Sequence, residues 1–157
     1  MRARSIRLFF AALLLASLGS SPAANPGGAL FFPKGAVILD GQFISKMTGI
    51  YPGAYIQTLE GSGTFVLPDS IVVIAAHSQA GDSAGCFYLW CGVITVSGTS
   101  GPSVRADHVA IFSASRGPVK FHVGRVGGMT HVISVAGPLL INTGGRENQL
   151  LPSGQAV

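Results

Sequence analysis

Charged residues are scarce in this sequence. Only 10% of its 157 residues are Asp, Glu, Lys or Arg, against about 25% in an average globular domain. Ten basic and six acidic residues give a formal net charge of +4. Three of the basic residues lie at the extreme N-terminus, and beyond them seven basic residues stand against six acidic ones. The sequence therefore predicts no basic surface for nucleic acid, and its apolar surface must be buried in a core, a partner or an assembly.

Long apolar runs are also absent. A membrane-spanning helix needs about 20 apolar residues, whereas the run Leu8–Leu18 has only about half that length. It follows an arginine-rich start, and Ser21 and Ala23 then occupy the −3 and −1 positions of a cleavage site. This order is typical of a signal peptide. We predict that residues 1–24 are cleaved during export and that the protein is secreted, periplasmic or on the cell surface.

The rest of the chain has room for one domain with a core, and not for two. Residues 25–35 begin with a Gly/Pro-rich stretch, and we expect a flexible N-terminal segment there. A single all-β domain is predicted over residues 36–143. The closing stretch, residues 144–157, is polar and rich in glycine, which predicts a loop-like tail.

Helix signals are missing from the predicted domain. No capping box precedes apolar residues at helical spacing, and Gly and Pro instead recur at roughly the 8–12-residue spacing of all-β domains. Asp40-Gly41 lies between two apolar runs and suits a type I′ hairpin turn. The run "SIVVIAA" that starts at Ser70 is typical of a strand buried on both faces. We predict an antiparallel β-sandwich or barrel of about eight to ten short strands.

A β-solenoid is the alternative fold. In the second half of the chain, short apolar pairs are separated by small-residue corners, as in Val104/Ala106, Val109/Ile111, Val119/Phe121 and His131/Ile133. Stacked coils produce such a pattern. A solenoid also needs a fixed repeat period, which the chain lacks, and the Asp-Gly hairpin favours antiparallel pairing.

Only two cysteines are present, Cys86 and Cys91, and they bracket four bulky residues. A strand would separate their Cα atoms by about 16 Å, whereas a disulfide needs them within about 7 Å. A Cys86–Cys91 bridge, which export to an oxidising compartment favours, therefore requires a turn between them. That turn would expose a binding tip made of Phe87, Tyr88, Leu89 and Trp90. The alternative is a buried strand with two separate thiols.

Three histidines fall on successive predicted strands: His108, His122 and His131. Neighbouring strands could gather their imidazoles into a metal site, which would make the protein a metal-dependent β-barrel enzyme. Side-chain alternation predicts that His122 faces solvent while His108 and His131 face the core. That division, and the lack of H-x-H or H-E-x-x-H spacing, argue against a shared site.

Catalytic motifs are lacking as well. There is no G-x-S-x-G nucleophile elbow, and the glycine clusters lack the strand-to-helix context of a phosphate loop. We predict no catalytic residues and no cofactor. The sequence favours an exported small β-domain with a structural, adhesive or binding role, which self-associates or binds a protein partner.

Overall fold

The computed structural model describes residues 29–145 and 147–157, so the predicted signal peptide lies outside the described residues. The described chain consists of strands, turns and loops without a helix, and thus has no helix that could cross a bilayer. Its fifteen strands are β1 (Ala29–Lys34), β2 (Val37–Leu39), β3 (Gln42–Ile44), β4 (Thr48–Ile50), β5 (Tyr55–Thr58), β6 (Ser62–Val66), β7 (Ser70–Ile74), β8 (Gln79–Ser83), β9 (Cys86–Gly98), β10 (Ser103–Ala106), β11 (Val109–Ser113), β12 (Val119–Val126), β13 (Met129–Ala136), β14 (Leu139–Asn142) and β15 (Gln149–Leu151).

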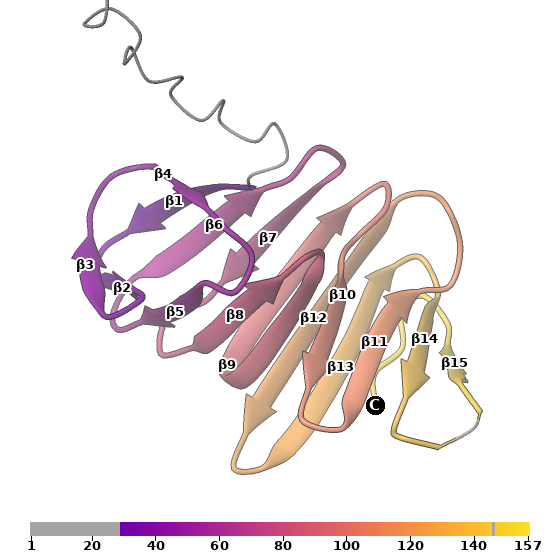
Figure 1. The fold of residues 1–157 in the computed structure, drawn as a ribbon. Helices are drawn as coiled ribbons and strands as arrows, with labels where there is room; N and C mark the ends of the chain where they lie inside the picture. Colours follow the sequence, from indigo (N-terminus) through magenta and orange to yellow (C-terminus); the bar gives the residue numbers. More distant parts are fainter. Residues whose placement is uncertain (1–28, 146) are drawn as a thin grey trace, which may run out of the picture.

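The strands pair into two layers that share the long strand β9 (Figure 1). The first layer has the order β4-β1-β6-β7-β9-β12-β13, and the second has the order β3-β2-β5-β8-β9-β10-β11-β14-β15. The beginning of β9 pairs in the second layer with β8 and β10, and its end pairs in the first layer with β7 and β12. Every pairing is antiparallel except that of β9 with β10.

The core lies between the two layers and is built from alternate residues of each strand. In β6, for example, Gly63 and Phe65 are buried while Ser62, Thr64 and Val66 are more exposed. Phe65 packs edge-to-face on Phe87 of the second layer, with ring centroids 4.9 Å apart. Such edge-to-face contacts add to the free energy gained by burying the rings.

The predicted all-β sandwich is therefore confirmed. The strands of each layer end at open edges, so they form neither a closed barrel nor the repeated coils of a solenoid. The number of strands exceeds the predicted eight to ten, because several strands are only three residues long.

The Asp40-Gly41 hairpin is confirmed. Leu39 of β2 pairs with Gln42 of β3, and the two residues between them have φ angles of 47° and 82°. Both angles are positive, as a type I′ turn requires. The Asp40 carboxylate also accepts a hydrogen bond of 2.8 Å from the backbone N–H of Tyr55, which ties this turn to β5.

Along one side of the sandwich, the chain passes between the layers at corners that stack on one another. The N–H of Leu59 donates to the carbonyl of Ala36 at 3.0 Å, and the N–H of His77 donates to the carbonyl of Leu59 at 2.8 Å. A further hydrogen bond in this stack runs from the N–H of Ala75 to the carbonyl of Val93, at 3.0 Å.

Two buried hydroxyl groups join these corners. Thr58 Oγ1 accepts a 2.9 Å hydrogen bond from the N–H of Ser78, and Ser78 Oγ accepts one of 3.0 Å from the N–H of Val93. Neither residue is more than 2% exposed. Gly92, at φ 92°, leaves the space that the Ser78 side chain fills.

Both ends of the chain differ from the prediction. Residues Ala29–Lys34 form β1, which pairs with β4 and β6 and contributes the fully buried Phe31 to the core. The end of the predicted tail returns to the first layer, where Val157 exchanges two backbone hydrogen bonds with Val132 of β13, of 2.7 and 2.9 Å. The domain thus extends beyond residues 36–143, because both end segments carry apolar residues, such as Phe31 and Leu151, that the core buries.

Candidate functional site

β9 carries the whole CFYLWC stretch as extended chain. Cys86 and Cys91 both lie on this strand and are both free thiols. Pairing with β8 on one side and with β10 on the other leaves no turn between them. The predicted Cys86–Cys91 disulfide is therefore not formed, because two rows of backbone hydrogen bonds hold the two cysteines apart along the strand.

Alternation along β9 divides the predicted binding tip into two faces. Phe87 and Leu89 are 0% and 1% exposed and belong to the core, so the prediction that they form an exposed tip is wrong. Tyr88 and Trp90 point to the outer surface of the second layer, where Trp90 is 49% exposed. Only these two of the four predicted residues can contact a ligand.

A β-bulge positions Trp90. Leu89 pairs with Ala80, but Gln79 pairs with Cys91, so one residue of β9 is left without a partner on β8. The indole leans over β8 at Gly81, where a Cβ atom would lie 2.8 Å from Trp90 Cη2. Bulges commonly redirect side chains in this way, and the glycine leaves the surface free for the ring.

Trp90 lies between two tyrosines, and we name Tyr55, Tyr88 and Trp90 the aromatic cluster. Tyr55 of β5 and Tyr88 of β9 flank Gly81 in the register of the sheet. The Tyr55 and Trp90 ring centroids are 5.4 Å apart with the planes at 51°, and those of Tyr88 and Trp90 are 6.4 Å apart with the planes at 22°. The cluster therefore bridges three neighbouring strands on the outer face of the second layer.

Hydrogen-bonding side chains border the aromatic cluster. Gln57 of β5 and Gln79 of β8 pair with each other, and both belong to the outward-facing set of their strands. On the other side, Arg105 of β10 lies opposite Tyr88 and is exposed. Among the ion pairs of the described residues, none involves Arg105. Amide and guanidinium groups thus border the rings on both sides.

Asp82 follows the cluster on β8 but faces inward. It is 9% exposed, and its backbone pairs with Gly53 and Ala54. Burial raises the pKa of the Asp82 carboxyl above its usual value of 3.8, and a hydrogen bond from the N–H of Gly85 opposes the rise. Asp82 therefore has no direct part in the surface formed by the aromatic cluster.

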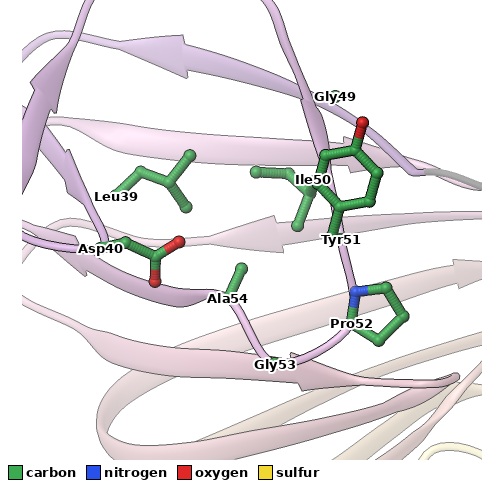
Figure 2. A pocket seen from close by; sticks show the side chains of 8 residues that line it. All are labelled: Leu39, Asp40, Gly49, Ile50, Tyr51, Pro52, Gly53 and Ala54. Carbon is green, nitrogen blue, oxygen red and sulfur yellow. The ribbon is translucent and has the colours of Figure 1, made fainter. Parts of the chain in front are cut away.

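A shallow pocket of about 440 Å³ lies beside the start of β5 (Figure 2). Its lining is mainly apolar and consists of Leu39, Asp40, Gly49, Ile50, Tyr51, Pro52, Gly53 and Ala54. The only carboxylate in it already binds the backbone of β5. The lining contains no histidine, cysteine, serine or lysine, so the pocket has neither a nucleophile–base pair nor a set of metal ligands.

The three histidines lie on three different parts of the fold, and all three are at least partly exposed. His122 of β12 contacts Thr95 Oγ1 through Nδ1 at 2.8 Å, His131 is exposed on β13, and His108 lies in the β10–β11 turn beside Asp107 at 3.1 Å. No group of three possible metal ligands occurs within residues 29–145 and 147–157. The predicted metal site on His108, His122 and His131 is therefore not assembled.

The outward orientation of His122 is as predicted, but the inward orientation of the other two histidines is wrong. His108 belongs to a turn, where strand alternation does not apply. In β13 the buried residues are Val132 and Ser134, and the Ser134 hydroxyl donates to the carbonyl of Gly137 at 2.6 Å. A satisfied serine can face the core, and His131 consequently faces solvent.

The sequence did not indicate that Tyr55 belongs to the aromatic cluster, or that Gly81 lies beneath Trp90. Period-two alternation within a strand was signal enough to place Tyr88 and Trp90 on one face. No local pattern indicates that β5 and β8 lie next to β9, because that depends on pairing between distant segments.

Comparison with models of known protein families, with curated proteins and with solved structures gives no match for this chain.

Proposed function

We propose that this protein is an exported binding module whose ligand contacts the aromatic cluster. The observation that supports this proposal is the half-exposed Trp90, which a bulge and a glycine hold between two tyrosines. Rigid aromatic side chains on a sheet supply much contact area with little loss of conformational entropy. Tryptophan and tyrosine are also the residue types that most often dominate binding energies.

The position of Gly81 supports the same proposal. Glycine in the interior of a strand destabilises it by roughly 0.5–1 kcal/mol relative to alanine. Gly81 is buried and lies beneath the indole, where a Cβ would crowd both the Trp90 ring and the carbonyl of Ala54. A glycine at position 81 therefore makes β8 less stable than alanine would, but it leaves room for the exposed Trp90 ring.

Export is part of this proposal and rests on the arginines, the short apolar run and the small residues of the first 24 positions. We expect the mature protein outside the cytoplasm, where a structural or adhesive role would use the same surface. Edman sequencing of the protein recovered from the medium or envelope should start at or near residue 25. Recovery of uncleaved protein in the cytoplasm would contradict the export part alone.

The binding function is tested by cosedimentation of purified protein with whole cells and envelope fractions of the producing organism. Trp90→Ala should weaken binding roughly tenfold or more, because a central aromatic contact is lost. Phe112→Ala is the matched control, since Phe112 is 40% exposed on β11 of the same layer but outside the cluster. Equal binding by wild type and Trp90→Ala would exclude the cluster as the binding surface.

Self-association is a second candidate, favoured by the outer face of the first layer. Leu30, Val66 and Ile71 are paired across β1, β6 and β7 and are 43%, 39% and 45% exposed. They form an uninterrupted aliphatic row, which is unusual on the surface of a monomer. A second copy of the chain could bury the row against its own.

Ile71→Lys tests self-association by placing a charge at the β7 end of that row. We expect wild type to elute as a dimer or larger species at micromolar concentration and Ile71→Lys as a monomer, in size-exclusion chromatography with light scattering. Val126→Lys changes an equally aliphatic residue, 64% exposed at the β12–β13 hairpin, and should leave the mass unchanged. A monomeric wild type would refute this candidate without affecting the aromatic cluster.

A further inference from the structure

We infer that the ligand of the aromatic cluster is a carbohydrate, bound through the faces of its pyranose rings. This inference rests on the binding function proposed above and names the chemical class of the ligand.

The aromatic rings match the apolar face of a sugar. A pyranose ring carries a patch of C–H groups with partial positive charge, and the face of an aromatic ring is negative because of its quadrupole. Trp90 is the largest ring of the cluster and is half-exposed, while the plane of Tyr88 deviates from its plane by only 22°. The two rings together offer a sugar an aromatic surface larger than that of a single side chain.

The polar side chains beside the rings match the hydroxyl groups at the rim of a sugar. Each hydroxyl both donates and accepts hydrogen bonds, and so does each side-chain amide. Gln57 and Gln79 supply two amides on one side of the cluster, and the Arg105 guanidinium supplies donors on the other. An aliphatic ligand would leave these groups without partners, which costs binding free energy.

The surface is also open and extended. The cluster and Arg105 lie on four adjacent strands, from β5 to β10, which span about 14 Å at the usual strand spacing. A site that extends across four strands suits the side of a chain of sugars, whereas a single small ligand is usually enclosed in a pocket.

Other ligand classes fit less well. A nucleic acid would stack on the rings, but it needs several cations along its phosphates. Among the described strands, the pairing places one basic side chain beside the cluster, that of Arg105. A lipid or an apolar peptide would match the aliphatic row of the first layer better than a surface bordered by two amides. A protein ligand is therefore the main competing outcome.

The test treats the envelope fraction before cosedimentation. Periodate cleaves the vicinal diols of sugars and leaves the polypeptide backbone intact. A broad-specificity protease cleaves the polypeptide backbone and leaves the sugars intact. We expect periodate to reduce binding of wild type to the level of Trp90→Ala, and protease to leave it unchanged.

The outcomes separate the two proposals. If protease abolishes binding and periodate does not, or if neither does, the carbohydrate inference is overturned while the binding function stands. If both treatments abolish binding, the glycans that the protease digestion releases are added to untreated envelope fraction as competitors for the protein. If these glycans do not reduce binding, the inference is overturned. If wild type never exceeds Trp90→Ala, the binding function itself is overturned.

A second variant tests whether the position of the indole matters. Gly81→Ala should push Trp90 out of place and weaken binding of the same fraction, or of the competing glycans, by roughly tenfold, with the aromatic residues intact. Gly124→Ala is the control, since its Cβ would meet nothing closer than 3.8 Å on β12 of the other layer. Circular dichroism and thermal unfolding show whether each variant is folded, and unchanged binding by a folded Gly81→Ala protein overturns the assignment of the site to the Trp90 ring.

Discussion

Asp82 shows how a single residue can link stability to pH. Its carboxyl group is buried on β8 and has a raised pKa. The folded state therefore holds the proton more tightly than the unfolded state does. The group stabilises the fold most when it is protonated, and this contribution is lost as the pH rises through the raised pKa.

Asp82→Asn should make the protein more stable at pH 7, since it removes a buried charge and keeps an oxygen that can accept from the N–H of Gly85. The gain over wild type should shrink as the pH falls through the pKa of Asp82 and should be gone below the usual aspartate pKa of 3.8. Urea unfolding at several pH values, followed by the fluorescence of the only tryptophan, measures this difference. A difference that does not change with pH would contradict the assignment.

At the scale of elements, β9 organises both the core and the surface. Its residues alternate between the core and the outer face, and its bulge shifts that alternation by one residue before the strand enters the first layer, where Ile94 and Val96 are buried. The same bulge places the Trp90 ring over Gly81 of β8. The change of layer and the exposure of the ring thus have a common structural origin.

The stacked corners are the elements most sensitive to substitution. Gly92→Ala would place a methyl group against Ser78 at a φ of 92°, which alanine tolerates poorly. Ser78→Ala would leave the N–H of Val93 without its partner, at a cost of about 1–3 kcal/mol. We expect Gly92→Ala to lower the free energy of unfolding by more than Ser78→Ala does. The added methyl group displaces the Ser78 side chain and also forces alanine into an unfavourable φ.

Chemical denaturation of these two variants beside Gly124→Ala provides the measurement. Gly124→Ala lacks both the positive φ and the close contact, so it should change stability little. If Gly92→Ala were as stable as Gly124→Ala, the corner would not have the tight packing described above.

At the scale of the whole molecule, the sequence was sufficient for the fold class but not for the assembly of the site. Glycine spacing, β-branched runs and the Asp40-Gly41 turn report on local backbone, and the all-β sandwich follows from them. The free cysteines, the buried Phe87 and Leu89 and the exposed His131 depend on which strands are neighbours. Pairing between segments far apart in sequence leaves no mark in a local pattern.

The order of the strands has a consequence for how the protein folds. The colours of Figure 1 run across the molecule in nearly the order of the sequence, and in the described strands no paired residues are further apart in the chain than Leu30 and Val66. Each new segment can therefore add to an edge that has already formed, and little loop-closure entropy is lost at any step. If the chain is exported unfolded, as proposed above, its N-terminal strands can pair as they emerge from the membrane, before its last residues are released.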